Sequence, residues 1–179
     1  MEEVSDKQLN KQGIQIVNEY LKPNTSSANK RGEVFTPLNL IREMLFGIRK
    51  SKIDTKKVSI HMDEYMENIW GIDKNGICIE DKETDRIGGI GKEIWENKNS
   101  TFLDPSSGIG NFLIIIYYKL MYSLRNKIKN DNERSYHILT NMLYMIELDG
   151  ENIKKCKNLF NMISSQKNVK INILNTNTL

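Results

Sequence analysis

The sequence has few cysteines and prolines and no long apolar run. Its two cysteines, Cys78 and Cys156, lie far apart and belong to no Cys-x-x-Cys or Cys/His cluster. This spacing argues against a disulfide scaffold and a zinc site, so we expect no bound metal and a reducing, cytoplasmic location. The longest apolar stretch, Phe112–Tyr118, is much shorter than the roughly 20 residues that a membrane-spanning helix needs. We therefore expect no membrane segment.

The composition is that of a folded domain with a core. Of the 179 residues, 39% are hydrophobic and 27% are charged, which argues against a disordered chain. The formal net charge is only +3. This small basic excess permits binding to nucleic acid but does not require it.

The first 50 residues have the pattern of a helical segment. Apolar residues at helical spacing predict a helix over 5–21, and a polar loop follows from Pro23. A second helix is expected to begin at Thr36-Pro37, with Thr36 as its N-cap. Four residues form its expected apolar face: Leu38, Ile41, Leu45 and Ile48. Residues 51–100 carry one hairpin signal, Asn75-Gly76, and we interpret them as an insertion of unassigned role.

From Thr101 onward, apolar strands alternate with helical stretches. The pattern predicts strands over 101–103, 143–146 and 169–174 and helices over 110–127, 133–141 and 151–163. This alternation predicts an α/β fold with a parallel sheet in residues 101–179. We expect three methionines in its core: Met142, Met145 and Met162.

A glycine-containing turn follows the first of these strands. In Phe102–Phe112, the strand ends at Asp104, and the chain then passes Gly108 and Gly110 into a helix. Ligands of open α/β sheets bind at the carboxyl ends of strands. Glycine allows close backbone approach, and the free N–H groups at a helix start favour an anionic group. On its own, this pattern also fits an ordinary tight turn between a strand and a helix.

A second acidic group follows the next strand, at Glu147-Leu148-Asp149. A carboxylate at the tip of this strand can accept two hydrogen bonds from a ribose diol, as in dinucleotide-binding folds. We assign this role to Glu147 and expect Asp149 to cap the following helix. The alternative is that both residues serve only the helix start.

Together these residues resemble class I S-adenosylmethionine-dependent methyltransferases, specifically N6-adenine DNA methyltransferases of the restriction–modification or phage type. Gly32–Pro37 is similar to the family's N-terminal cofactor motif, and Asp104-Pro105-x-x-Gly108-x-Gly110-Asn111-Phe112 resembles its first motif. Ile173–Leu179 resembles the third motif. The resemblance covers roughly 30–48 and 95–179. It implies a Rossmann-like methyltransferase fold, of which this chain contains the first three strands after an N-terminal helical segment.

The resemblance also implies which residues contact the cofactor, S-adenosyl-L-methionine. By this resemblance, Phe35, Thr36 and Pro37 enclose the methionine end of the cofactor. Its amino group lies near Asp104, with Gly108 and Gly110 beneath it, and Asn111 and Phe112 shape the wall of the pocket. Glu147 holds the ribose, and Asn177 contacts the adenine. A cationic amine suits a carboxylate, and an adenine amino group suits a side-chain oxygen.

The family's catalytic motif, Asp/Asn-Pro-Pro-Tyr/Phe, does not occur in this sequence. The three prolines, Pro23, Pro37 and Pro105, are isolated, so no catalytic residue is assigned. We therefore expect a cofactor-binding portion that transfers no methyl group by itself and meets DNA through the full-length enzyme. A three-stranded sheet has an open edge. We expect a C-terminal half or a second copy to cover it.

Two alternatives are compatible with the same residues. In the first, the methyl acceptor is RNA or a protein amide rather than DNA. Methyltransferases that act on these acceptors share the later Pro-Pro motif with those that act on DNA. Alternatively, the chain is a binding or assembly module that keeps the fold without catalysis.

Overall fold

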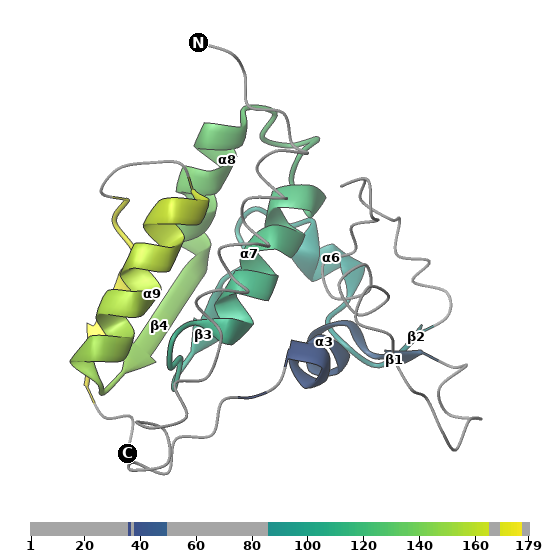
Figure 1. Cartoon of the computed structure of the whole chain (residues 1–179). Coiled ribbons are helices and arrows are strands. Elements are labelled where there is room, and N and C mark those ends of the chain that lie inside the picture. The colour runs from purple at the N-terminus through teal and green to yellow at the C-terminus, as the bar shows by residue number, and fades with distance from the viewer. Residues whose placement is uncertain (1–35, 37, 50–85, 165–168, 177–179) are drawn as a thin grey trace.

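The computed structural model describes residues 36, 38–49, 86–164 and 169–176. The helix expected over 5–21 and the hairpin expected at Asn75-Gly76 lie outside these residues. Two sheets occur within the described part of the chain: a two-stranded antiparallel pair and a three-stranded parallel sheet with helices beside it (Figure 1).

The parallel sheet consists of β3 (Phe102–Asp104), β4 (Leu143–Glu147) and β5 (Asn172–Asn175), in that spatial order. Both pairings are parallel, and they align Leu103 with Tyr144 and Tyr144 with Asn172. The predicted α/β fold with a parallel sheet is therefore confirmed for these strands. All three carboxyl ends lie at one edge of the sheet.

Helices α7 (Asn111–Ser123) and α9 (Gly150–Ile163) connect these strands. Crossover connections between parallel strands are right-handed. The crossover from β3 to β4 and the crossover from β4 to β5 run in the same direction across the sheet, so α7 and α9 cover the same face. Figure 1 shows α7 and α9 side by side on that face. Residues on this face are buried, including Phe102, Leu143 and Met145. The core of the domain lies between the helices and this face.

The opposite face of the sheet presents apolar side chains to solvent. Leu103 is 61% exposed and Leu174 58%, and Tyr144 is also exposed. The register places Leu103 beside Tyr144, and Leu174 beside Ile146 on the same face of β4. Parallel sheets are almost always covered on both faces, because their connecting helices pack there. In the described part of the chain, this face is therefore an exposed apolar surface.

The N-terminal described segment forms α3 (Leu38–Phe46) and β1 (Ile48–Arg49). The prediction that Ile48 continues the apolar face of the helix is wrong. Gly47 has a left-handed φ of 82° and ends the helix, and Ile48 then pairs with Ile87. A Cβ on Gly47 would lie 2.4 Å from the carbonyl oxygen of Gly88, so no other residue fits this turn.

The returning segment contains β2 (Arg86–Ile87), which pairs with β1, and a short helix, α6 (Lys92–Trp95). Trp95 is buried, stacks on Phe102 and donates its indole N–H to the Ile90 carbonyl. Ile90 in turn donates its N–H to the Leu45 carbonyl at 2.8 Å. These contacts fasten α3 and α6 to the core.

Several predicted boundaries differ from the structure. The helix expected over 110–127 ends at Ser123, because the chain turns through Leu124 with bonds such as Lys127 N–H to the Leu124 carbonyl. The stretch 133–141 is a helix, α8 (Asp131–His137), followed by a π-helical turn (Ile138–Met142). The last strand begins at Asn172 rather than 169.

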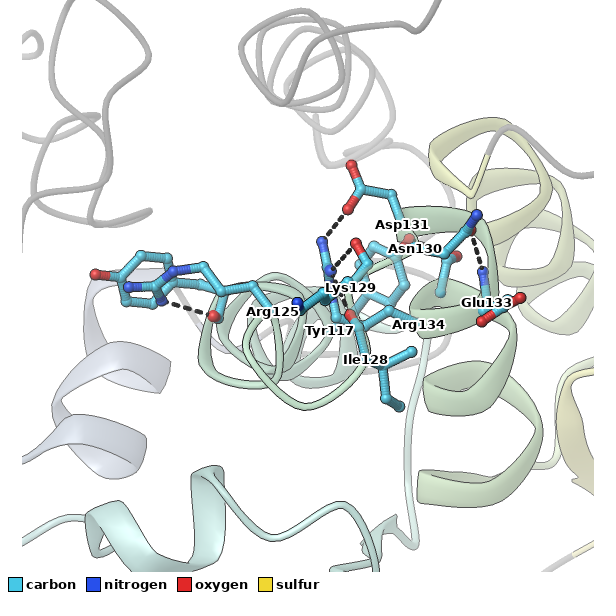
Figure 2. A network of polar contacts seen from close by, with 10 residues as sticks. Tyr117, Arg125, Ile128, Lys129, Asn130, Asp131, Glu133 and Arg134 are labelled. Atoms are coloured by element: carbon cyan, nitrogen blue, oxygen red, sulfur yellow. Dashed lines mark hydrogen bonds and ion pairs between the residues drawn. The ribbon is translucent and has the colours of Figure 1, made fainter.

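A buried arginine links α8 to the segment that connects α7 with α8. Arg134 is 3% exposed and pairs through Nη2 with Asp131, while Nη1 donates to the carbonyls of Ile128 (2.7 Å) and Lys129 (3.3 Å) (Figure 2). The neighbouring Ser135 hydroxyl bonds the Tyr117 hydroxyl on α7 at 2.7 Å. This network holds the layer of helices together on the covered face. None of the helices described in the structure is long and apolar enough to cross a membrane.

Candidate functional site

Two carboxylates end neighbouring strands at the carboxyl edge of the sheet. Asp104 is the last residue of β3, and Glu147 is the last residue of β4. Burial raises the pKa of Asp104. The Ser106 N–H, which Asp104 Oδ1 accepts at 3.1 Å, opposes this rise, and the charge of Glu147 adds to it. The edge is therefore electronegative and suited to a ligand with a positive charge.

The Glu147 carboxylate joins the two loops that follow these strands. Its Oε2 accepts the Gly108 N–H at 2.7 Å, and its Oε1 accepts the Asp149 N–H at 2.8 Å. The adjacent Ser107 N–H donates to the Ile146 carbonyl at 3.0 Å. The glycine turn is thus held against the end of β4. Each carboxylate oxygen still has a lone pair for a further donor.

The two glycines of the turn have left-handed φ angles, 54° at Gly108 and 94° at Gly110. A Cβ on Gly110 would lie 2.9 Å from the Cys156 Sγ on α9. Gly110 is therefore needed for close packing of α7 against α9. Burial and the charges of Asp104 and Glu147 raise the pKa of the Cys156 thiol to about 12, with Lys157 opposing, so this thiol stays protonated.

The N-terminus of α7 has no side-chain cap, whereas Asn130 caps α8 and Asp149 caps α9. The predicted capping role of Asp149 is confirmed by its 2.8 Å bond from the Glu151 N–H. Two buried oxygens near the start of α7, Ser107 Oγ and Asn111 Oδ1, have no hydrogen-bond partner among the described residues. The uncapped helix start therefore favours an anionic ligand group, whereas the two oxygens can accept hydrogen bonds from a ligand donor.

The remaining predicted residues fall into three groups. Pro105 is exposed in the turn after β3, and Phe112 is half-buried against the core. Thr36 is half-buried just before α3, a helix that packs against α7. Phe35, Pro37 and Asn177 lie outside the described residues.

The sequence analysis missed three residues that shape this edge: Ser107, Cys156 and Asn175. Asn175 ends β5, and its Nδ2 donates to the backbone carbonyls of Glu147 (3.0 Å) and Leu148 (2.8 Å). Its place at the end of an apolar strand, within the Ile173–Leu179 stretch, was the available signal. The three strand ends are thus joined by polar contacts that run from the glycine turn through Glu147 to Asn175.

The described residues contain no group of three or more His, Cys, Asp or Glu side chains that could hold a metal ion. No protein-family model matches this chain, and no curated protein sequence matches it. The residues of the site offer two carboxylates for cationic or hydroxyl groups, and a helix start for an anionic group.

Proposed function

We propose that this chain is the S-adenosylmethionine-binding portion of an N6-adenine DNA methyltransferase, with a Rossmann-like methyltransferase fold. The observation that supports it best is the pair of carboxylates, Asp104 and Glu147, on either side of the glycine turn at the carboxyl edge of a parallel sheet. The sequential strand order matches one half of a doubly wound sheet, whose ligands bind at this edge.

In this proposal, each polar group of the edge has a matching group on the cofactor. Asp104 binds the ammonium of the methionine end, and the uncapped start of α7 faces its carboxylate. Glu147 accepts the ribose hydroxyls with the lone pairs that Gly108 and Asp149 leave unused. Asn177 contacts the adenine, and Phe35–Pro37 close over the methionine end. The buried, unpartnered oxygens of Ser107 and Asn111 fit a polar ligand here.

The proposal gives this chain cofactor binding rather than catalysis. When bound, S-adenosylmethionine supplies an activated methyl group, and the family acceptor is the exocyclic amine of a flipped adenine. The acceptor-binding Pro-Pro motif does not occur in this sequence. Methyl transfer to DNA therefore requires residues from a further polypeptide segment. The same segment decides between DNA and the alternative acceptors, RNA and protein.

The exposed apolar face of the sheet supports a covering partner. Leu103, Tyr144 and Leu174 present apolar surface that a parallel sheet normally buries. We propose that a C-terminal half or a second copy covers this face together with the open sheet edge. Analytical ultracentrifugation of the 179-residue chain tests the second copy, since a dilute compact monomer would exclude it.

Calorimetric titration of S-adenosylmethionine into the full 179-residue chain tests the function. We expect binding that Glu147→Gln weakens by about 1–3 kcal/mol, the cost of leaving polar groups unsatisfied. The matched control is Glu133→Gln, an exposed glutamate in the first turn of α8, which should bind normally. ATP serves as a second control, because its triphosphate should be repelled by Asp104 and Glu147.

A folded wild-type chain that binds no S-adenosylmethionine would contradict the proposal. Circular dichroism on the same sample establishes that the chain is folded. That outcome would favour the alternative of an assembly module that keeps the fold without its cofactor. Equal binding of ATP would instead indicate a general nucleotide site.

A further inference from the structure

Strand β5 has an asparagine at each end, and both side chains bind backbone carbonyls next to β4. Asn172 donates through Nδ2 to the carbonyls of Thr140 (2.8 Å) and Leu143 (3.1 Å), where β4 begins. Asn175 donates through Nδ2 to the carbonyls of Glu147 (3.0 Å) and Leu148 (2.8 Å), where β4 ends. The two residues have the same chemistry, but only Asn175 lies at the edge with the candidate site.

The turn after β4 has little apolar packing to hold it. Leu148, its central residue, is 66% exposed. Polar bonds therefore fix its backbone: Asn175 binds two of its carbonyls, and Glu147 Oε1 accepts the Asp149 N–H. Because the Glu147 side chain extends from this turn, the direction of its carboxylate depends on the turn's backbone.

We propose that Asn175 is a positioning residue of the site: it fixes the turn over Glu147–Asp149 so that the Glu147 carboxylate stays on the Gly108 N–H. The value of this positioning for a ligand rests on the proposed cofactor-binding function. A carboxamide suits the role because its NH₂ group has two hydrogens, one for each carbonyl. Aspartate at this position would instead place an oxygen against two carbonyl oxygens.

The Gly108 amide proton reports the positioning directly, in the full chain without ligand. A short, charge-assisted hydrogen bond shifts an amide proton downfield in the NMR spectrum. We expect Asn175→Ala and Asn175→Asp to move this resonance toward the position it has in Glu147→Gln, where the charged acceptor is lost. Asn172→Ala, the matched control at the other end of β5, should leave it unchanged even if it lowers stability.

Titration with S-adenosylmethionine gives the second readout. We expect Asn175→Asp to weaken binding about three- to tenfold, as for the loss of one or two neutral hydrogen bonds. Asn172→Ala should bind as wild type does. If Asn175→Asp fails to fold, Asn175→Ala carries the same test, because water can solvate the two exposed carbonyls.

The two proposals fail separately. An unchanged Gly108 resonance in a folded Asn175 variant would overturn the positioning role, whatever the affinity for S-adenosylmethionine. A shifted Gly108 resonance in the Asn175 variants, together with a folded wild-type chain that binds no S-adenosylmethionine, would retain the positioning role and overturn the cofactor proposal.

Discussion

The Gly108 N–H donates a 2.7 Å hydrogen bond to Glu147 Oε2, across 39 positions of the chain. This bond joins the turn after β3 to the end of β4, so the candidate site cannot form until the two strands are paired. A local motif, the glycine turn, is thus given its shape by a distant residue. Formation of the site is coupled to formation of the sheet.

Replacing Glu147 should destabilise the chain even without a ligand. Glu147→Ala removes the acceptor of two backbone N–H groups, those of Gly108 and Asp149. We expect the free energy of unfolding to fall by about 1–3 kcal/mol, measured by urea denaturation. A variant as stable as wild type would show that water replaces this carboxylate at no cost.

Substitutions at three glycines separate the effect of backbone strain from the effect of crowding at Gly110, the residue before α7. Gly110→Ala meets both, since φ is 94° and the new Cβ would lie 2.9 Å from Cys156 Sγ, so we expect a loss of about 2–5 kcal/mol. Gly88→Ala has a φ of 79° but nothing within 4 Å, which predicts about 1–2 kcal/mol. Gly150→Ala has neither problem and should be neutral or slightly stabilising.

The double variant Gly110→Ala/Cys156→Ala completes this series. Removing the thiol relieves the crowding but not the strain, so its effect should differ from the sum of the single changes. Thermal unfolding of all variants gives the comparison. Additive losses at Gly110 and Cys156 would contradict the close contact between α7 and α9.

Asp104→Asn should stabilise the ligand-free chain while lowering its affinity for S-adenosylmethionine. Folding raises the pKa of Asp104 above 3.8, so the unfolded chain loses this proton first as pH rises, and the free energy of unfolding falls over that interval. Asparagine cannot ionise, and its oxygen can still accept the Ser106 N–H. We expect the variant to be more stable than wild type at neutral pH. We expect its affinity for S-adenosylmethionine to be reduced by about tenfold or more.

The pH dependence provides the control for Asp104. Well below pH 3.8, Asp104 is protonated in both the folded and the unfolded wild-type chain. The greater free energy of unfolding of the asparagine variant should therefore vanish there. Urea denaturation at several pH values measures this difference. A constant difference across the range would mean that ionisation of Asp104 is not its cause.

Arg134→Met should be among the more damaging single changes on α8. The buried guanidinium binds Asp131 and the carbonyls of Ile128 and Lys129, all of which lose their partner. We expect a loss of about 2–4 kcal/mol in urea denaturation. The matched pair is Lys154–Glu151, whose side chains are exposed, so Lys154→Met should cause no measurable change.

Two tyrosines on α7, the buried Tyr117 and the partly buried Tyr118, should make the fold sensitive to alkali. Burial raises the pKa of Tyr117 to about 12, against the opposing bond to Ser135, and burial also raises the pKa of Tyr118. The unfolded chain ionises these groups near 10.0, so stability should fall as pH rises through 10. Ultraviolet difference spectroscopy should show their ionisation only together with unfolding. Early ionisation of all tyrosines in the folded chain would contradict this.

The alternation of strands and helices in residues 101–179 could be predicted because both element types have clear periodicity there. The capping role of Asp149 was also predictable, since it depends only on residues close in sequence. Met142 and Met145 are buried as expected, whereas Met162 is 38% exposed, because it lies on the outer side of α9. Hydrophobicity alone does not reveal which side of a helix faces the sheet.

The remaining features depend on contacts between distant segments. Gly47 looked like an interior helix residue, and only its fit against Gly88 shows why the helix stops there. The Asn175 bonds to Glu147 and Leu148 depend on strand register, which short segments do not specify. The packing of Cys156 beneath Gly110 likewise appears only once α7 and α9 are placed on the sheet.

The pairing of β1 with β2 has a consequence for how this chain tolerates changes in length. Arg49 lies opposite Arg86, so the two described residues on either side of residues 50–85 are one strand spacing apart. The entropy of closing a loop grows only slowly with its length once its ends are fixed. We therefore expect that the segment between Arg49 and Arg86 can be shortened, enlarged or exchanged for another domain. The strand ends around Glu147 should keep their geometry in such variants.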